Sequence, residues 1–155
     1  MKNTNLERGQ SLFELVVAVA ICALIIVAIV SLTTNSIQNS NFSKDKTLAA
    51  TYGQQATEWL RGQRDADAND FFGKASAAGT SNVCLNSLPA SIASLSVSDC
   101  SSGTTIAGTP FMRKVSFNVT TQNGKSIVEA DVLVSWKDSQ GIHEVTDATN
   151  FADLR

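Results

Sequence analysis

The strongest constraint on this chain is a run of sixteen consecutive apolar residues, LVVAVAICALIIVAIV, at positions 15–30. Extended to residues 11–32, the window holds 22 residues and one charge, Glu14. A helix of that length measures about 33 Å, because each residue adds about 1.5 Å, and this is enough to cross a hydrocarbon core of roughly 30 Å. We therefore expect one membrane-length helix followed by one small domain.

The short segment before the apolar run indicates the orientation of this helix. It carries Lys2 and Arg8 against Glu7. The positive-inside rule predicts that this segment stays in the cytoplasm and that the C-terminal domain lies outside. A secretory signal peptide has a shorter apolar core followed by a small-residue cleavage site, and no such site follows this run. We expect the helix to remain attached to the domain.

Glu14 is the one charge in this apolar window. A carboxylate costs about 2.5–3.5 kcal/mol at the bilayer centre on insertion scales, and less near the interface. Two interpretations follow. Glu14 lies close enough to the membrane edge to reach the headgroups, or it meets a cationic partner inside the membrane or an assembly.

The sequence around Glu14 resembles the leader of type IV prepilins. Arg8 and Gly9 are followed by Gln10-Ser11-Leu12-Phe13-Glu14 and then by the unbroken apolar run. The resemblance implies that a membrane prepilin peptidase cleaves between Gly9 and Gln10, that the new N-terminus at Gln10 is N-methylated, and that Glu14 is the fifth mature residue. Gln10 departs from the Phe or Met that is commonest at the first mature position.

The same resemblance implies a structural function rather than an enzyme. The new α-amine of Gln10 would pair with Glu14 of a neighbouring subunit, since an unpaired charge is costly in a bundle of apolar helices. The implied protein is a minor pilin of an extracellular filament, held in the inner membrane before assembly on the cell surface. Its implied partners are other pilin subunits, the prepilin peptidase, an inner-membrane assembly platform and the lipid bilayer. The alternatives are a pseudopilin of a type II secretion system and a singly anchored extracytoplasmic binding domain.

A second, polar part of the helix is predicted to follow the membrane half. No Pro or Gly occurs at positions 10–52, and a stripe of larger and small apolar residues recurs at helical spacing: Ile37, Leu48, Tyr52, Ala56 and Trp59. We expect one helix from about residue 11 to about residue 63, with this stripe packed on a domain. Ser, Thr and Asn at positions 33–43 are weak helix formers.

Residues 64–110 are predicted to be mostly loop. Twelve of the 32 residues at positions 79–110 are Ser or Thr, and Asp99 is the only charge there. Cys84 and Cys100 flank the middle of this segment, and outside the cytoplasm they are able to form a disulfide. The alternative is two buried thiols. Cys22 lies in the apolar run and is read as a small apolar residue.

The remainder of the chain has the period of two that is typical of strands. Alternation predicts strands at 111–121 and 126–137, with an Asn123-Gly124 turn between them, and a third strand at 142–149 after a turn at 138–141. The predicted fold is therefore α+β, with a long N-terminal helix covering a small antiparallel sheet, as in pilins. The domain layout is a leader (1–9), a membrane or filament-core half-helix (10–32) and a head (33–155).

Candidate sites for other chemistry are few. His143 is the only histidine, which leaves little basis for a Ser-His-Asp site, and we expect it at an exposed strand position. No zinc-ligand spacing, Walker A motif or cofactor motif occurs, and the scattered basic residues do not favour nucleic acid as a partner. Asp65, Asp67 and Asn69 match the opening of a calcium loop, but the turn glycine and the twelfth-position Glu are missing, so a solvated turn is favoured.

Overall fold

The computed structural model describes residues 7–101, 103–122 and 124–153, and describes side chains from Leu12 onward within these ranges. It forms two compact units, Met1–Lys44 and Asp45–Arg155, which we call the N-terminal unit and the head. In chain order the elements are α1 (Glu7–Ala66), α2 (Ala68–Ala78), β1 (Val83–Cys84), a short 3-10 helix η1 (Ile92–Ser94), β2 (Met112–Gln122), β3 (Lys125–Asp138) and β4 (Gly141–Ala152).

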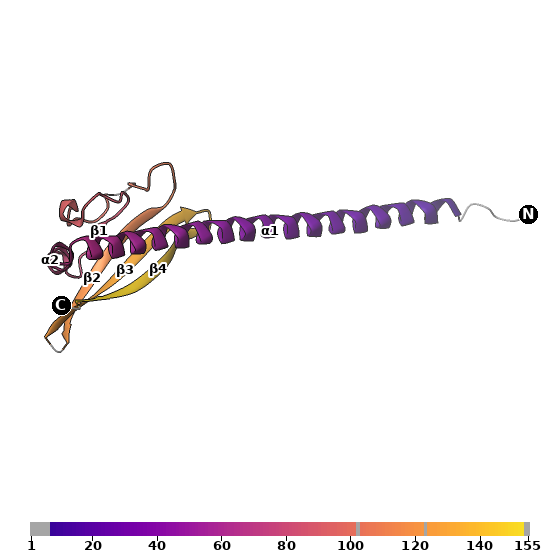
Figure 1. The fold of residues 1–155 in the computed structure, drawn as a ribbon. Coiled ribbons are helices and arrows are strands. Elements are labelled where there is room, and N and C mark those ends of the chain that lie inside the picture. Colours follow the sequence, from indigo (N-terminus) through magenta and orange to yellow (C-terminus); the bar gives the residue numbers. More distant parts are fainter. Residues whose placement is uncertain (1–6, 102, 123, 154–155) are drawn as a thin grey trace, which may run out of the picture. The chain divides into compact units, whose positions relative to one another are not determined.

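Helix α1 is continuous over 60 residues and belongs to both units (Figure 1). This agrees with the predicted long helix, although α1 ends at Ala66 rather than near residue 63. The stretch rich in Ser, Thr and Asn is helical, and within it Thr33 and Thr34 donate their hydroxyls to the carbonyls of Ile29 and Val30, four residues back, at 2.9 Å.

The head contains a four-stranded antiparallel sheet with the order β1-β2-β3-β4. The three long strands confirm the predicted meander, and β4 extends to Ala152, three residues beyond the predicted end. Gly124 has a φ of 77° between β2 and β3, which a glycine adopts without strain. Its predicted turn partner, Asn123, lies outside the described residues.

One face of the sheet and the C-terminal part of α1 form the core of the head (Figure 1). The sheet contributes alternate buried residues: Val115 and Phe117 from β2, and Val128, Ala130, Val132, Val134 and Trp136 from β3. The helix contributes Ala49, Gly53, Ala56 and Leu60, which are buried at helical spacing.

The predicted helix stripe was only partly right. Ala56 is fully buried, and Tyr52 and Trp59 are half-buried. Leu48 and Ile37 are exposed, to 37% and 56%. The helix instead faces the sheet with small residues. At Gly53 the sheet is near: a Cβ added there would lie 3.6 Å from Cβ of Asp147 and 3.9 Å from Val134, at ordinary contact distance. Ile37 belongs to the N-terminal unit rather than to the head.

The predicted loop at 64–110 contains a helix that the sequence reasoning missed. Asp67 caps α2, its side chain accepting a hydrogen bond from the backbone N–H of Asp70 at 3.1 Å. Phe71 of α2 is fully buried and packs against the rings of Phe151 and Phe117, at centroid distances of 5.0 and 6.4 Å. The expectation of loop with short elements holds for residues 79–110, which contain β1 and η1.

Candidate functional site

The predicted processing site lies at the start of α1. The backbones of Gly9 and Gln10 are part of the helix. The side chain of Gln10 and all of residues 1–6 lie outside the described part of the chain. Glu14 is helical and exposed, and it is flanked by Phe13 and Leu15, whose side chains are also exposed. The structure therefore gives Glu14 a regular helical position within an apolar surface.

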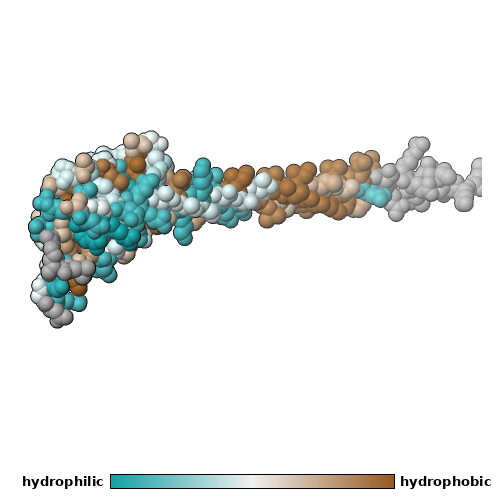
Figure 2. Space-filling view, viewed as in Figure 1, coloured by the Kyte–Doolittle hydropathy of each residue, from teal (hydrophilic) through white to brown (hydrophobic). Residues whose placement is uncertain are grey.

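Helix α1 has an apolar surface over its first half (Figure 2). Its window of highest mean hydropathy reaches 3.3, and by length and composition this helix is able to cross a membrane. The large apolar side chains at positions 12–32 are all at least 40% exposed in this chain. Water contact over such a surface is unfavourable, so the surface calls for a lipid or protein environment.

Cys84 and Cys100 form a disulfide, which confirms the predicted bridge and excludes two buried thiols. The enclosed loop is also attached to α1. The indole Nε1–H of Trp59 donates to the carbonyl of Pro89 at 2.8 Å, and the backbone N–H of Ile92 donates to Oε1 of Gln63 at 2.8 Å. The loop is thus fixed at its base by the disulfide and at its middle by the helix.

Arg113 of β2 connects this loop to α1. The residue is 2% exposed, and its guanidinium donates to the backbone carbonyls of Leu85 at 2.8 Å and Tyr52 at 2.9 Å. Within the described part of the chain, no carboxylate forms an ion pair with it. Burial lowers the pKa of Arg113 from its ordinary value, because the charged form has lost water. Main-chain carbonyls replace that water.

Arg113 is the buried side chain that the sequence reasoning missed. Val115 and Phe117 of β2 face inward at alternate positions. Continuing the same alternation two residues back places Arg113 on the inward face, between Phe111 and Val115. The alternation of inward and outward residues along this strand was therefore enough to predict that Arg113 is buried.

His143 lies on β4 as expected, but it is half-buried rather than exposed. Its ring lies 5.3 Å from that of Trp136, and its Nε2 is 2.9 Å from Oδ1 of Asp138. The same oxygen accepts the backbone N–H groups of Gln140 and Gly141. Partial burial alone raises the pKa of Asp138, but these hydrogen bonds outweigh it and the pKa lies below its ordinary value. The arrangement stabilises the turn between β3 and β4.

The acidic residues of the calcium candidate have other partners. Asp65 pairs with Arg64 at 2.6 Å, and Asp67 caps α2, whereas Asn69 is exposed on α2. Across the described residues, no group of three or more His, Cys, Asp or Glu side chains is arranged to hold a metal ion. Local helix capping accounts for Asp67 in this motif.

No family model matches the chain, and no curated protein or solved structure matches it.

Proposed function

We propose that this chain is a minor pilin, a structural subunit of a type IV pilus-like extracellular filament. The proposal rests on one observation: Gly9, Glu14 and an unbroken apolar helix occur together at the spacing of a prepilin leader. Prepilin peptidase cleaves between Gly9 and Gln10 and the new N-terminus is N-methylated. The chain is held in the inner membrane until it is assembled.

The apolar surface of α1 supports this proposal. A bilayer covers that surface before assembly, and the corresponding helices of neighbouring subunits cover it in the filament. The driving force for assembly is then non-directional packing of apolar side chains, which does not by itself set the register between subunits.

Glu14 supplies that register. Cleavage after Gly9 creates an α-amine four positions before Glu14 in the sequence. The amine of one subunit pairs with the carboxylate of its neighbour, because either charge left alone among apolar helices is strongly unfavourable. An incoming subunit out of register would leave both charges without a partner.

The direct test is mass spectrometry of the intact protein and of its N-terminal peptide, in cells with and without prepilin peptidase. Membrane fractions and sheared surface fractions are measured separately. The expected product in peptidase-positive cells is a chain that begins at Gln10. In peptidase-negative cells, and for Gly9→Val, the chain should retain residues 1–9. A chain that retains them in peptidase-positive cells is a simple membrane anchor, and the proposal fails.

A matched pair of variants tests the role of Glu14. Glu14→Ala should insert, fold and be processed, but should be depleted from the sheared filament fraction. Glu58→Ala removes an exposed carboxylate from the head part of the same helix and should be incorporated normally. Equal incorporation of the two variants would remove the proposed role of Glu14. A processed chain confined to the membrane fraction would favour the type II secretion pseudopilin.

A further inference from the structure

Two adjoining hollows lie beside the disulfide in the head. Their volumes are about 240 and 400 Å³, and they share a wall made by Cys84, Asn86, Ser87 and Ser98. We call the pair the disulfide groove. Both hollows are shallow and open to solvent, and the larger one has the volume of a small-ligand site without the enclosure of one. Neither hollow belongs to the apolar helix surface on which the proposed filament role depends.

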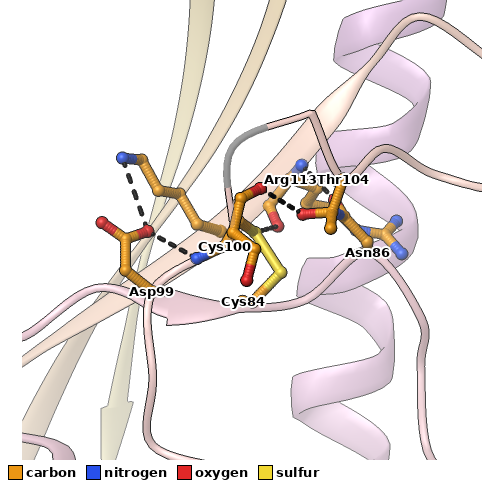
Figure 3. Close-up of polar contacts among 8 residues, drawn as sticks. Cys84, Asn86, Asp99, Cys100, Thr104 and Arg113 are labelled. Carbon is orange, nitrogen blue, oxygen red and sulfur yellow. Dashed lines mark hydrogen bonds and ion pairs between the residues drawn. A yellow bond between two sulfur atoms is a disulfide. The ribbon is translucent and has the colours of Figure 1, made fainter.

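The wall of the disulfide groove is held rigidly from behind (Figure 3). The side-chain carbonyl of Asn86 accepts the backbone N–H of Arg113 at 2.7 Å, and its amide lies 3.4 Å from Oγ1 of Thr104. The backbone N–H of Cys84 donates to the carbonyl of Ser98 at 2.8 Å. A wall fixed in this way loses little conformational entropy when a ligand binds.

The lining of the groove has an unusual chemical composition. Most lining side chains carry a hydroxyl: Ser87, Ser94, Ser96, Ser98, Ser101, Thr104 and Thr105. A hydroxyl is able both to donate and to accept a hydrogen bond. Ser94 and Thr104 already donate theirs to the backbone carbonyls of Ser91 and Ser101, so these two offer a ligand only acceptor capacity. Pro89 and Leu95 add a small apolar area to the narrower hollow. Such a lining suits a ligand that has many polar groups and short C–H faces.

The charge of the groove disfavours anionic ligands. Asp99 is the one ionisable side chain among the described residues that line it, and its carboxylate is 55% exposed. Lys114 forms an ion pair with this carboxylate, with Nζ 3.8 Å from Oδ1, but it is not a lining residue. A phosphate or carboxylate ligand would face Asp99 without a cationic partner in the groove.

We propose that the disulfide groove binds a neutral saccharide of one or two sugar units. Ring hydroxyls of the sugar form hydrogen bonds with the serine and threonine side chains. Sugar hydroxyls also donate to Oδ2 of Asp99, because Oδ1 already accepts from the backbone N–H of Cys100 and pairs with Lys114. The C–H face of one ring lies on Pro89 and Leu95. The expected dissociation constant is roughly 0.1–1 mM, because a shallow polar site gains little beyond the water that it displaces.

The test uses the full chain in phosphatidylcholine nanodiscs, which avoids sugar-based detergents. The probes are an array of neutral and acidic glycans, followed by saturation-transfer NMR with free neutral mono- and disaccharides. Ser87→Trp fills the wall shared by the two hollows. Ser139→Trp makes the same substitution at an exposed serine between β3 and β4 and is the matched control. Circular dichroism and an intact disulfide establish that both variants are folded.

The expected result is binding of a neutral saccharide that Ser87→Trp weakens at least ~10-fold, while Ser139→Trp binds like the parent. Three results would overturn the proposal: no neutral saccharide binds to the parent chain, acidic glycans or hydroxyl-rich peptides bind in preference, or Ser87→Trp binds as well as the parent. None of these results bears on cleavage at Gly9, because binding in nanodiscs needs neither processing nor assembly.

Discussion

Replacing both Cys84 and Cys100 by serine should lower the free energy of unfolding of the head by about 3 kcal/mol. The two cysteines are 16 positions apart. In the chain-entropy treatment, a crosslink of that span removes unfolded-state freedom worth about 3 kcal/mol at 25 °C. A small domain has about 5–15 kcal/mol of stability in total, so the loss is a large fraction of it.

The native contacts of the loop should survive this substitution. The loop remains attached to α1 by the hydrogen bonds from Trp59 to Pro89 and from Ile92 to Gln63, and Ile92 is buried. The effect therefore lies in the unfolded chain, which becomes freer, rather than in the folded one. The fluorescence of Trp59 in the folded protein reports whether these contacts survive, because its indole donates to the carbonyl of Pro89 in the loop.

The assay is urea unfolding of the full chain in nanodiscs, followed by the fluorescence of Trp59 and Trp136. With a slope of roughly 1.5–2 kcal/mol per M, the midpoint should fall by about 1.5–2 M. Cys22→Ser is the matched control and should leave the midpoint unchanged, because Cys22 is a free cysteine outside the head. A loss below about 1 kcal/mol would refute the entropic reasoning. So would an altered Trp59 spectrum without urea, which would mean that losing the disulfide changes the folded loop and not only the unfolded chain.

Substitutions at three further positions of the head are tested by the same unfolding assay. Gly53→Ala should stabilise the head by about 0.5–1 kcal/mol, because glycine is a poor helix former and a Cβ there meets Val134 at ordinary contact distance. Gly53→Leu should destabilise the head by about 1–3 kcal/mol, because the larger side chain overpacks the same contact. Phe71→Ala should cost about 3–5 kcal/mol by leaving a cavity against the sheet. The lowered pKa of Asp138 means that its ionised form stabilises the fold at neutral pH. This contribution disappears as the pH falls below about 4. The stability of Asp138→Asn should therefore fall less steeply in acid than that of the parent. Equal acid profiles for Asp138→Asn and the parent would show that the bonds from His143 and the turn do not favour the carboxylate.

The parts of the fold that could be predicted are those with a local signal. Alternation placed β2 and β3 within one residue of their observed ends, and the absence of helix breakers gave most of α1. The predicted end of β4, at residue 149, is three residues short. Residues 150–152 continue the strand, and Phe151 enters the core opposite Val128.

The parts that could not be predicted depend on tertiary packing. Helix α2 is short and contains Gly73, and its stability comes from Phe71 meeting Phe117 and Phe151, which are distant in the sequence. The buried face of α1 was misjudged because a hydrophobic pattern favours large residues such as Leu48. Close approach to the sheet instead requires small ones such as Gly53. The disulfide groove depends on loop packing that leaves no sequence pattern.

Arg113 shows why the loop, the sheet and the helix of the head are coupled. A buried cation without a carboxylate partner is unfavourable unless its donors are satisfied, and here main-chain carbonyls of Leu85 and Tyr52 satisfy two of them. Carbonyls cannot be lost by protonation or by side-chain substitution, so this connection is insensitive to pH and to sequence change at either acceptor. The backbone N–H of Arg113 also fixes Asn86, which is part of the groove wall. A shift of α1 at Tyr52 would therefore reach the groove through one side chain.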